Sequence, residues 1–155
     1  MEIKAELIKP YTENERMDFI VLENHNNGYE IRETETALQA WGYTEEEKAQ
    51  QEAERIAQLH LTRGDVFRAL LMSRQVTRAQ IRALIEQMPD ETPEEQIAKE
   101  YALIDFDESL DFYRGVALID TLGTQLGISS EAMTQFFETN DYHYLIPDVR
   151  VQNED

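Results

Sequence analysis

Residues 62–88 read TRGDVFRALLMSRQVTRAQIRALIEQM and contain two helix starts close together. Thr62 can cap a first helix, and Thr77 with Gln80 forms a capping box for a second. The apolar residues available to the first helix are Val66, Phe67, Ala69, Leu70 and Leu71. The stretch therefore predicts two short helices joined by a tight turn.

Comparable start signals continue on both sides of this stretch. Thr44 and Glu47 form another capping box, which opens a polar helix expected to run to about Leu59. Thr92 followed by Pro93 is typical of a helix start, because proline fits the first helical position. The apolar residues that this helix would hold are Ile97, Tyr101, Leu103 and Ile104.

The last third of the chain also predicts helices. A helix that starts at Asp107 or Ser109 is expected to continue to Gly127, which would end it, since glycine is common just after a helix. Ser129 is placed to cap a final helix, which residues 136–137, both phenylalanine, would anchor.

The first 43 residues mix strand and helix patterns. Residues 3–8 alternate apolar and polar side chains, which predicts a short strand. A capping box at Thr12 starts a helix, and residues 29–34 predict a second strand. Residues 36–41 are expected to form a short helix that stops at Gly42. The helix after Thr12 would bury a stripe made of Met17, Ile20 and Val21, widened by Phe19 and Leu22.

These patterns predict a mainly α fold: a multi-helix bundle with a small N-terminal β-α-β element, of the α+β class. We expect a strand-helix-strand module at 1–43, a polar linking helix at 44–62, a helical body at 63–147 and a polar tail at 148–155. The whole is expected to behave as one cooperative domain, and no internal repeat is evident.

Composition excludes several classes of protein. The 155 residues include no cysteine, so disulfides, zinc–thiolate sites and thiol nucleophiles are excluded. No apolar run approaches the roughly 18–20 residues of a membrane-spanning helix, and the first residues do not resemble a secretory signal. The formal net charge of −18 opposes binding to nucleic acid or anionic membranes. It suits solubility, a basic protein partner or mimicry of nucleic acid.

The sequence offers little for catalysis or cofactors. None of His25, His60 and His143 has a metal-like spacing to another histidine. The carboxylates from Asp105 to Asp111 alternate as in the start of a calcium loop, but they lack its central glycine and closing glutamate. We find no phosphate-binding glycine loop and no nucleophile motif. We therefore predict a protein that is not an enzyme, with no catalytic residue, metal or cofactor.

Basic residues gather in residues 62–88. The arginines there are Arg63, Arg68, Arg74, Arg78 and Arg82. Arg78 and Arg82 are four residues apart and should share a helix face. The two helices resemble a helix-turn-helix in outline, which would suit DNA contact. Pairing with the protein's own carboxylates fits the charge better. We take Arg68, Arg74, Arg78 and Arg82 as candidate residues for binding a partner.

Trp41 and Tyr43 are a second candidate for partner binding. They flank Gly42 at an expected break between helices. Exposed aromatic residues are frequent energetic anchors of interfaces. Buried, they would instead join the N-terminal module to the helical body.

Three segments resemble a family of small phage- and prophage-encoded proteins. They are IKAELIKPYT at 3–12, AWGYTEEE at 40–47, and LGI at 126–128 with FFE at 136–138. Genes of that family typically lie near tail and tail-fibre genes, and no catalytic residues are established for it. The resemblance implies an accessory role in the host cytoplasm or in association with the virion.

Two functions remain open. The protein can be an assembly or structural accessory that binds a phage tail or tail-fibre protein. Alternatively, it can be an acidic inhibitor of a host anti-phage defence complex, of the anti-CRISPR kind, whose carboxylates stand in for phosphates. Both have a protein partner and involve neither direct nucleic-acid contact nor a membrane. Whether the chain forms a homo-oligomer is also open.

Overall fold

The computed structural model describes residues 1–147, and the predicted tail at 148–155 lies outside the described residues. The chain divides into two compact units within one helix: unit 1 is Met1–Ala53 and unit 2 begins at Glu54. The fold is mainly α with a small N-terminal sheet, as the sequence predicts. Within residues 1–147, no helix combines the length and apolar character that crossing a bilayer requires.

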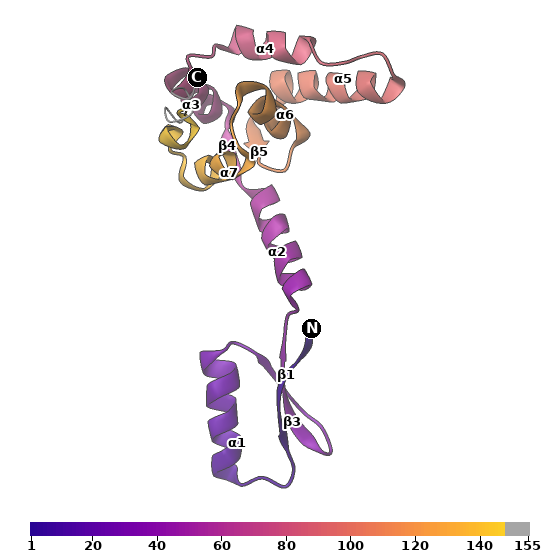
Figure 1. Cartoon of the computed structure of the whole chain (residues 1–155), viewed down its shortest axis with the longest axis vertical. Coiled ribbons are helices and arrows are strands. Elements are labelled where there is room, and N and C mark those ends of the chain that lie inside the picture. The colour runs from indigo at the N-terminus through magenta and orange to yellow at the C-terminus, as the bar shows by residue number, and fades with distance from the viewer. Residues whose placement is uncertain (148–155) are drawn as a thin grey trace, which may run out of the picture. The chain divides into compact units, whose positions relative to one another are not determined.

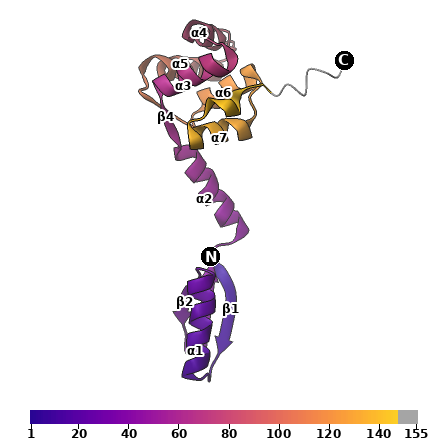
Figure 2. The same cartoon turned by 90° about the vertical axis from the view of Figure 1, so that its left-hand side faces the viewer.

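Unit 1 contains a three-stranded antiparallel sheet in the order β1-β3-β2. Its elements are β1 (Glu2–Ile8), α1 (Glu13–Ile20), the π-helical segment η1 (Val21–Asn26), β2 (Glu30–Glu33) and β3 (Ala37–Gly42). Helix α1 covers one face of the sheet (Figures 1 and 2). The buried apolar residues of unit 1 are Ala37, Leu38 and Ala40, so its core is small.

The short helix expected at residues 36–41 is wrong: this segment is β3, the central strand of the sheet. Alanine, leucine and glutamine favour helix locally. Pairing with strands on both sides overrides that preference, because strand formation depends on context. Trp41 consequently lies inside a strand, and Gly42 ends that strand instead of separating two helices.

The expected apolar stripe of the first helix is partly wrong. Phe19 and Ile20 are half-buried, whereas Met17, Val21 and Leu22 are exposed. The helix turns Glu23 inward instead, where Asn27 Nδ2 donates to its Oε2 at 3.2 Å. Unit 1 therefore leaves apolar side chains on its outer helix surface.

The described part of unit 2, residues 54–147, packs five helices around one hydrophobic core. Its elements are the end of α2 (Glu45–Gln58), β4 (His60–Thr62), α3 (Arg63–Arg74), α4 (Arg78–Glu86), α5 (Pro93–Glu108), β5 (Asp111–Tyr113), α6 (Ala117–Leu126), α7 (Ser130–Thr139) and the 3₁₀ turn η2 (Tyr142–Leu145). Phe67 contacts Phe106 and Phe112 with ring centroids 5.4 and 5.7 Å apart. Leu145 is fully buried and docks the end of the described chain.

Most of the sequence signals for helix starts are confirmed, those at Thr12, Thr62, Thr77, Thr92 and Ser129. Capping boxes are present at Thr77 and Thr92, and Thr62 and Ser129 cap their helices through side-chain oxygens. The single helix expected from about residue 107 to Gly127 is wrong, because β5 and a turn precede α6.

The turn before α6 is required by packing. A Cβ on Gly115 would lie 2.8 Å from Ala57 Cβ, so only glycine allows this approach of the backbone to α2. β5 reaches the same region by pairing antiparallel with β4. Tertiary pairing therefore ends the helical pattern there.

Unit 2 contains a structural repeat that the sequence does not reveal. Both β4-α3-α4 and β5-α6-α7 consist of a short strand followed by Arg-Gly, a helix, a left-handed residue and a second helix. The equivalent residues are Arg63 and Arg114, Gly64 and Gly115, Gln75 and Gly127, Thr77 and Ser129, Ile81 and Met133, and Ile85 and Phe137. The expectation of no internal repeat is therefore wrong for the structure.

Backbone hydrogen bonds show that the two copies are related by an approximate two-fold axis. Leu61 pairs with Phe112 at the centre of the two-stranded sheet. On one side Arg63 N donates to Leu110 O at 2.8 Å, and on the other Arg114 N donates to Leu59 O at 2.7 Å. The two acceptors, Leu59 and Leu110, are equivalent positions of the repeat, as are the two donors, Arg63 and Arg114. The two hydrogen bonds are therefore equivalent.

Candidate interaction surfaces

Trp41 lies on the sheet of unit 1 and is half-buried. The Arg32 guanidinium lies over its ring, 4.6 Å from the centroid, and its Nε1 donates to Gln39 Oε1 at 3.1 Å. Tyr43 follows the strand and is exposed. Trp41 is thus held by polar neighbours on its own sheet.

Two of the candidate arginines interact locally within unit 2. Arg68 is exposed and donates to Asp65 Oδ1 at 2.8 Å, which holds the pKa of Asp65 below its usual range. Arg74 donates from Nε to Leu145 O at 2.6 Å and from Nη1 to Leu126 O at 2.8 Å. Burial lowers the pKa of Arg74. Arg74 therefore ties the end of the described chain to α6.

Arg78 and Arg82 do share a helix face, and Arg63 joins them. Together with Ala79 and Phe106 these three arginines line a shallow hollow of about 240 Å³, which we call the basic hollow. Arg63 Nη1 donates to Asp107 O at 2.8 Å, and its guanidinium lies 5.5 Å from the Phe106 ring centroid.

The arginines of the basic hollow differ in how far they are paired. Arg82 donates to the carboxylates of Asp107 and Glu86, and the Asp107 bond is the main reason that the pKa of Arg82 is raised. Arg78 is exposed, and its guanidinium makes no hydrogen bond or ion pair with residues 1–147. Within the described part of the chain, the guanidinium of Arg78 therefore has no partner and can bind a ligand.

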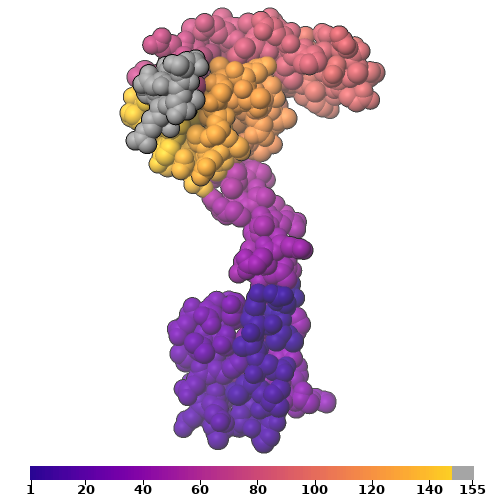
Figure 3. Space-filling model, in the orientation of Figure 1, coloured from indigo at the N-terminus to yellow at the C-terminus, as the bar shows by residue number. Residues whose placement is uncertain are grey.

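Helix α5 carries an apolar surface whose exposure the sequence does not predict. Ile97, Tyr101 and Ile104 are 55%, 65% and 45% exposed and follow one another at helical spacing. We call these three residues the outer face of α5. The core contacts of α5 come from Ala102 and Phe106, each 5% exposed, and from the half-buried Leu103. In the figures α4 and α5 run side by side, and the loop that connects them reaches past α6 (Figures 1 and 3).

Carboxylates border the outer face of α5 on both sides. By helical periodicity, Glu94 and Asp105 lie along one edge and Glu100 along the other, with Glu108 in line with the apolar residues. The sequence of α5 contains one basic residue, Lys99, whose Nζ pairs with Asp90 Oδ2 at 3.0 Å. The outer face is thus apolar along its middle and acidic at its margins.

A signal for this surface was present in the sequence. Residues 93–108 contain more apolar side chains than one face of a helix can hold, in two series. The sequence pattern predicts that this helix holds Ile97, Tyr101, Leu103 and Ile104, but it does not say which of them face the core. Periodicity identifies faces but does not show which of two apolar faces meets the core.

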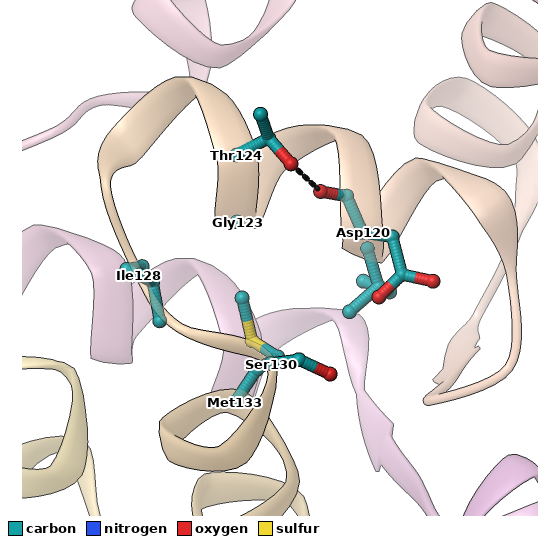
Figure 4. A pocket seen from close by; sticks show the side chains of 7 residues that line it. Asp120, Gly123, Thr124, Ile128, Ser130 and Met133 are labelled. Atoms are coloured by element: carbon teal, nitrogen blue, oxygen red, sulfur yellow. Dashed lines mark hydrogen bonds between the residues drawn. The ribbon is translucent and has the colours of Figure 1, made fainter.

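A second hollow, of about 340 Å³, lies between α6 and α7 (Figure 4). Its lining residues are Ile119, Asp120, Gly123, Thr124, Ile128, Ser130 and Met133. The Asp120 carboxylate accepts from Arg114 Nη1 at 2.7 Å, and Ser130 Oγ accepts from Arg114 Nη2 at 2.8 Å. Both polar groups thus hold the buried Arg114, and none of the lining residues is a base beside a nucleophile.

The carboxylates from Asp105 to Asp111 do not form a calcium loop. They continue α5 to Glu108 and then enter β5. No group of histidine, aspartate and glutamate within residues 1–147 is arranged to hold a metal ion. Comparisons with family models, with curated proteins and with solved structures find no match to this chain.

Proposed function

We propose that this protein is a non-catalytic binding protein whose outer face of α5 holds a basic amphipathic segment of another protein. The exposure of Ile97, Tyr101 and Ile104 between carboxylates carries the proposal. Contiguous exposed apolar residues with a polar border are typical of protein-binding sites. Tyrosine at the centre of such a patch is a frequent energetic anchor.

The negative charge around the outer face of α5 indicates what kind of molecule binds there. A second copy would bring the same carboxylates and a further net charge of −18, and like charges across an interface disfavour association. Nucleic acid would be repelled for the same reason. A helix with an apolar stripe and flanking lysines or arginines matches both features, since such a helix lays its apolar residues along an apolar surface.

The biological setting rests on the resemblance of residues 3–12 and 40–47 to phage- and prophage-encoded proteins. On that resemblance the protein is a phage accessory, its partner is a tail or tail-fibre protein, and it acts in the host cytoplasm or in association with the virion. The partner segment would be held while the tail is assembled or would remain bound in it.

The alternative, an inhibitor that mimics nucleic acid, requires a different surface. Duplex DNA carries a charge about every 1.7 Å along its axis, so a mimic needs carboxylates in closely spaced rows. On α5 the carboxylates are separated by Ile97, Tyr101 and Ile104. This favours a protein segment over the inhibitor.

The test compares full-length variants. Tagged wild-type protein is used to capture proteins from phage-infected host lysate, and the captured partner is purified and its affinity measured by calorimetry. Ile97→Glu and Tyr101→Glu should each weaken binding about tenfold or more, as loss of an interface anchor does. Leu71→Glu on α3 is the matched control, since Leu71 is 49% exposed. Equal affinities for all four proteins would refute the proposal, and capture of a nuclease complex would favour the inhibitor.

A further inference from the structure

We propose that the basic hollow of Arg63, Arg78 and Arg82 binds an oxyanion. This site is separate from the outer face of α5, and its test does not depend on the function proposed above. The structural repeat supports this site, because the equivalent arginine of the second copy shows which partners a guanidinium at this position takes.

In the second copy, Arg114 is 5% exposed and its guanidinium is surrounded by acceptors. Nε donates to Thr134 Oγ1 at 3.1 Å, and Nη1 donates to Asp120 Oδ1 at 2.7 Å. Nη2 donates to Ser130 O at 3.1 Å and to Ser130 Oγ at 2.8 Å. Two of these three residues, Ser130 and Thr134, belong to α7.

In the first copy, the positions equivalent to Ser130 and Thr134 are Arg78 and Arg82 on α4. Acceptors are thereby replaced by donors, because a guanidinium cannot accept a hydrogen bond. Arg63 accordingly turns to Asp107 O and to the Phe67 and Phe106 rings. The residues that line the hollow include Arg78 and Arg82, which replace the acceptor residues of the second copy, together with Arg63.

An oxyanion would supply the missing acceptors. Guanidinium groups bind carboxylate and phosphate through paired, charge-assisted hydrogen bonds. The carboxylates of Asp107 and Glu86 accept some of the hydrogen bonds that the Arg82 guanidinium can donate. The Arg78 guanidinium has no partner within residues 1–147. The buried Phe106 ring beneath the hollow excludes water from one side, which strengthens charge interactions there.

The protein's overall negative charge does not prevent this. At physiological salt the screening length is about 8 Å, so carboxylates far from the hollow contribute little. Three arginines line the hollow, and the carboxylates that form ion pairs with them within residues 1–147 are those of Asp107 and Glu86. The local charge therefore favours an anion in a chain that is otherwise acidic.

The experiment follows the arginine Nε–H signals of ¹⁵N-labelled full-length protein by NMR. Sodium phosphate is titrated against sodium chloride at equal ionic strength, and a short glutamate-rich peptide is the second probe. Phosphate, the peptide or both should shift the Arg78 and Arg82 signals in a saturable way that chloride does not reproduce. Tighter binding of the peptide identifies a carboxylate of a protein as the source, and tighter binding of phosphate identifies a phosphate group.

Two variants decide the result. Arg78→Gln should weaken binding of the responding probe about tenfold, the effect expected from one charge-assisted hydrogen bond. Arg68→Gln, at another exposed arginine of the same helical pair, should leave binding unchanged. Absence of a saturable response to both probes, or equal affinities for Arg78→Gln and wild type, would overturn the proposal.

Discussion

Arg63 and Arg114 occupy equivalent positions in two copies of one β-α-α motif, and their guanidinium groups have opposite environments. Arg114 is buried among the acceptors of Asp120, Ser130 and Thr134. Arg63 borders a hollow with two further arginines. The same backbone frame therefore supports a structural contact in one copy and a candidate binding site in the other.

Replacing the buried arginine should destabilise the protein far more than replacing its equivalent. Arg114→Gln removes four hydrogen bonds that a buried guanidinium makes to α6 and α7, and it removes the packing of that buried side chain. The loss should cost about 2–4 kcal/mol. Arg63→Gln should cost less than about 1 kcal/mol, since the Arg63 side chain donates one hydrogen bond, to Asp107 O, and is only half-buried. Urea denaturation of both variants measures the difference, and equal costs would contradict the proposed division of roles.

The left-handed residues of the two copies form a second matched pair. Gln75 has φ 56° and Gly127 has φ 68°. A side chain in this conformation costs about 1 kcal/mol, so Gln75→Gly should stabilise the protein by up to that amount. Gly127→Ala should destabilise it similarly, and a Cβ there meets no atom within 4 Å. Thermal unfolding is the measurement; opposite signs in the two variants are expected, and a shared sign would contradict the argument.

The helices of unit 2 could be predicted from sequence because their start signals are local. Thr77, Thr92 and Ser129 act within one turn of the chain. The strands β3, β4 and β5 could not, because each depends on a partner distant in sequence. Their segments are short, and local propensity alone cannot assign them.

The candidate sites, too, could be predicted where they depend on local spacing and could not where they depend on tertiary packing. That Arg78 and Arg82 share a face follows from helical spacing. That Arg63 joins them depends on how the strand β4 positions α3 beside α4. The outer face of α5 was missed because composition gives two apolar faces and only packing shows which one the core uses. The repeat was hidden because its equivalent positions share geometry more than residue type.

The two units should unfold separately. The sequence led us to expect one cooperative transition, but the buried cluster of unit 2 includes no residue of unit 1. The buried apolar residues of unit 1 are two alanines and a leucine, which is little for a unit of this size. Trp41 is the sole tryptophan and reports on unit 1.

Tryptophan fluorescence should therefore change at lower urea concentration than the helical circular dichroism signal, which comes mainly from unit 2. Trp41→Phe is the control that removes the early signal without touching unit 2. Coincident transitions by the two probes would show that the units unfold together.

Acid should weaken the docking of residues 141–145 onto the rest of unit 2. The Asp141 carboxylate accepts a hydrogen bond from the backbone N–H of His143 at 2.9 Å and lies 2.6 Å from Nδ1 of the His143 ring. These two contacts, the backbone one first, hold the pKa of Asp141 below its usual range. A lowered pKa stabilises the fold above the unfolded-state value, and this stability is lost as pH falls through the folded-state value. The free energy of unfolding should thus fall as pH drops below about 4.

Other carboxylates titrate in the same range, so the comparison with Asp141→Asn isolates this contribution. Asparagine can still accept from His143 N but does not titrate. Urea denaturation at a series of acidic pH values should show a smaller loss of stability in the variant. Parallel losses in both proteins would show that Asp141 does not contribute.

Binding of a basic segment along the outer face of α5 is tested most directly by crosslinking from Tyr101. Full-length protein carrying Tyr101→p-benzoylphenylalanine is irradiated in phage-infected host lysate, and crosslinked peptides are sequenced by mass spectrometry; the same group at Leu71 is the control. We predict that Tyr101 crosslinks to one protein, within a segment that carries an apolar stripe flanked by lysine or arginine. A crosslink to an acidic or uncharged segment, or the same products from both positions, would contradict the account.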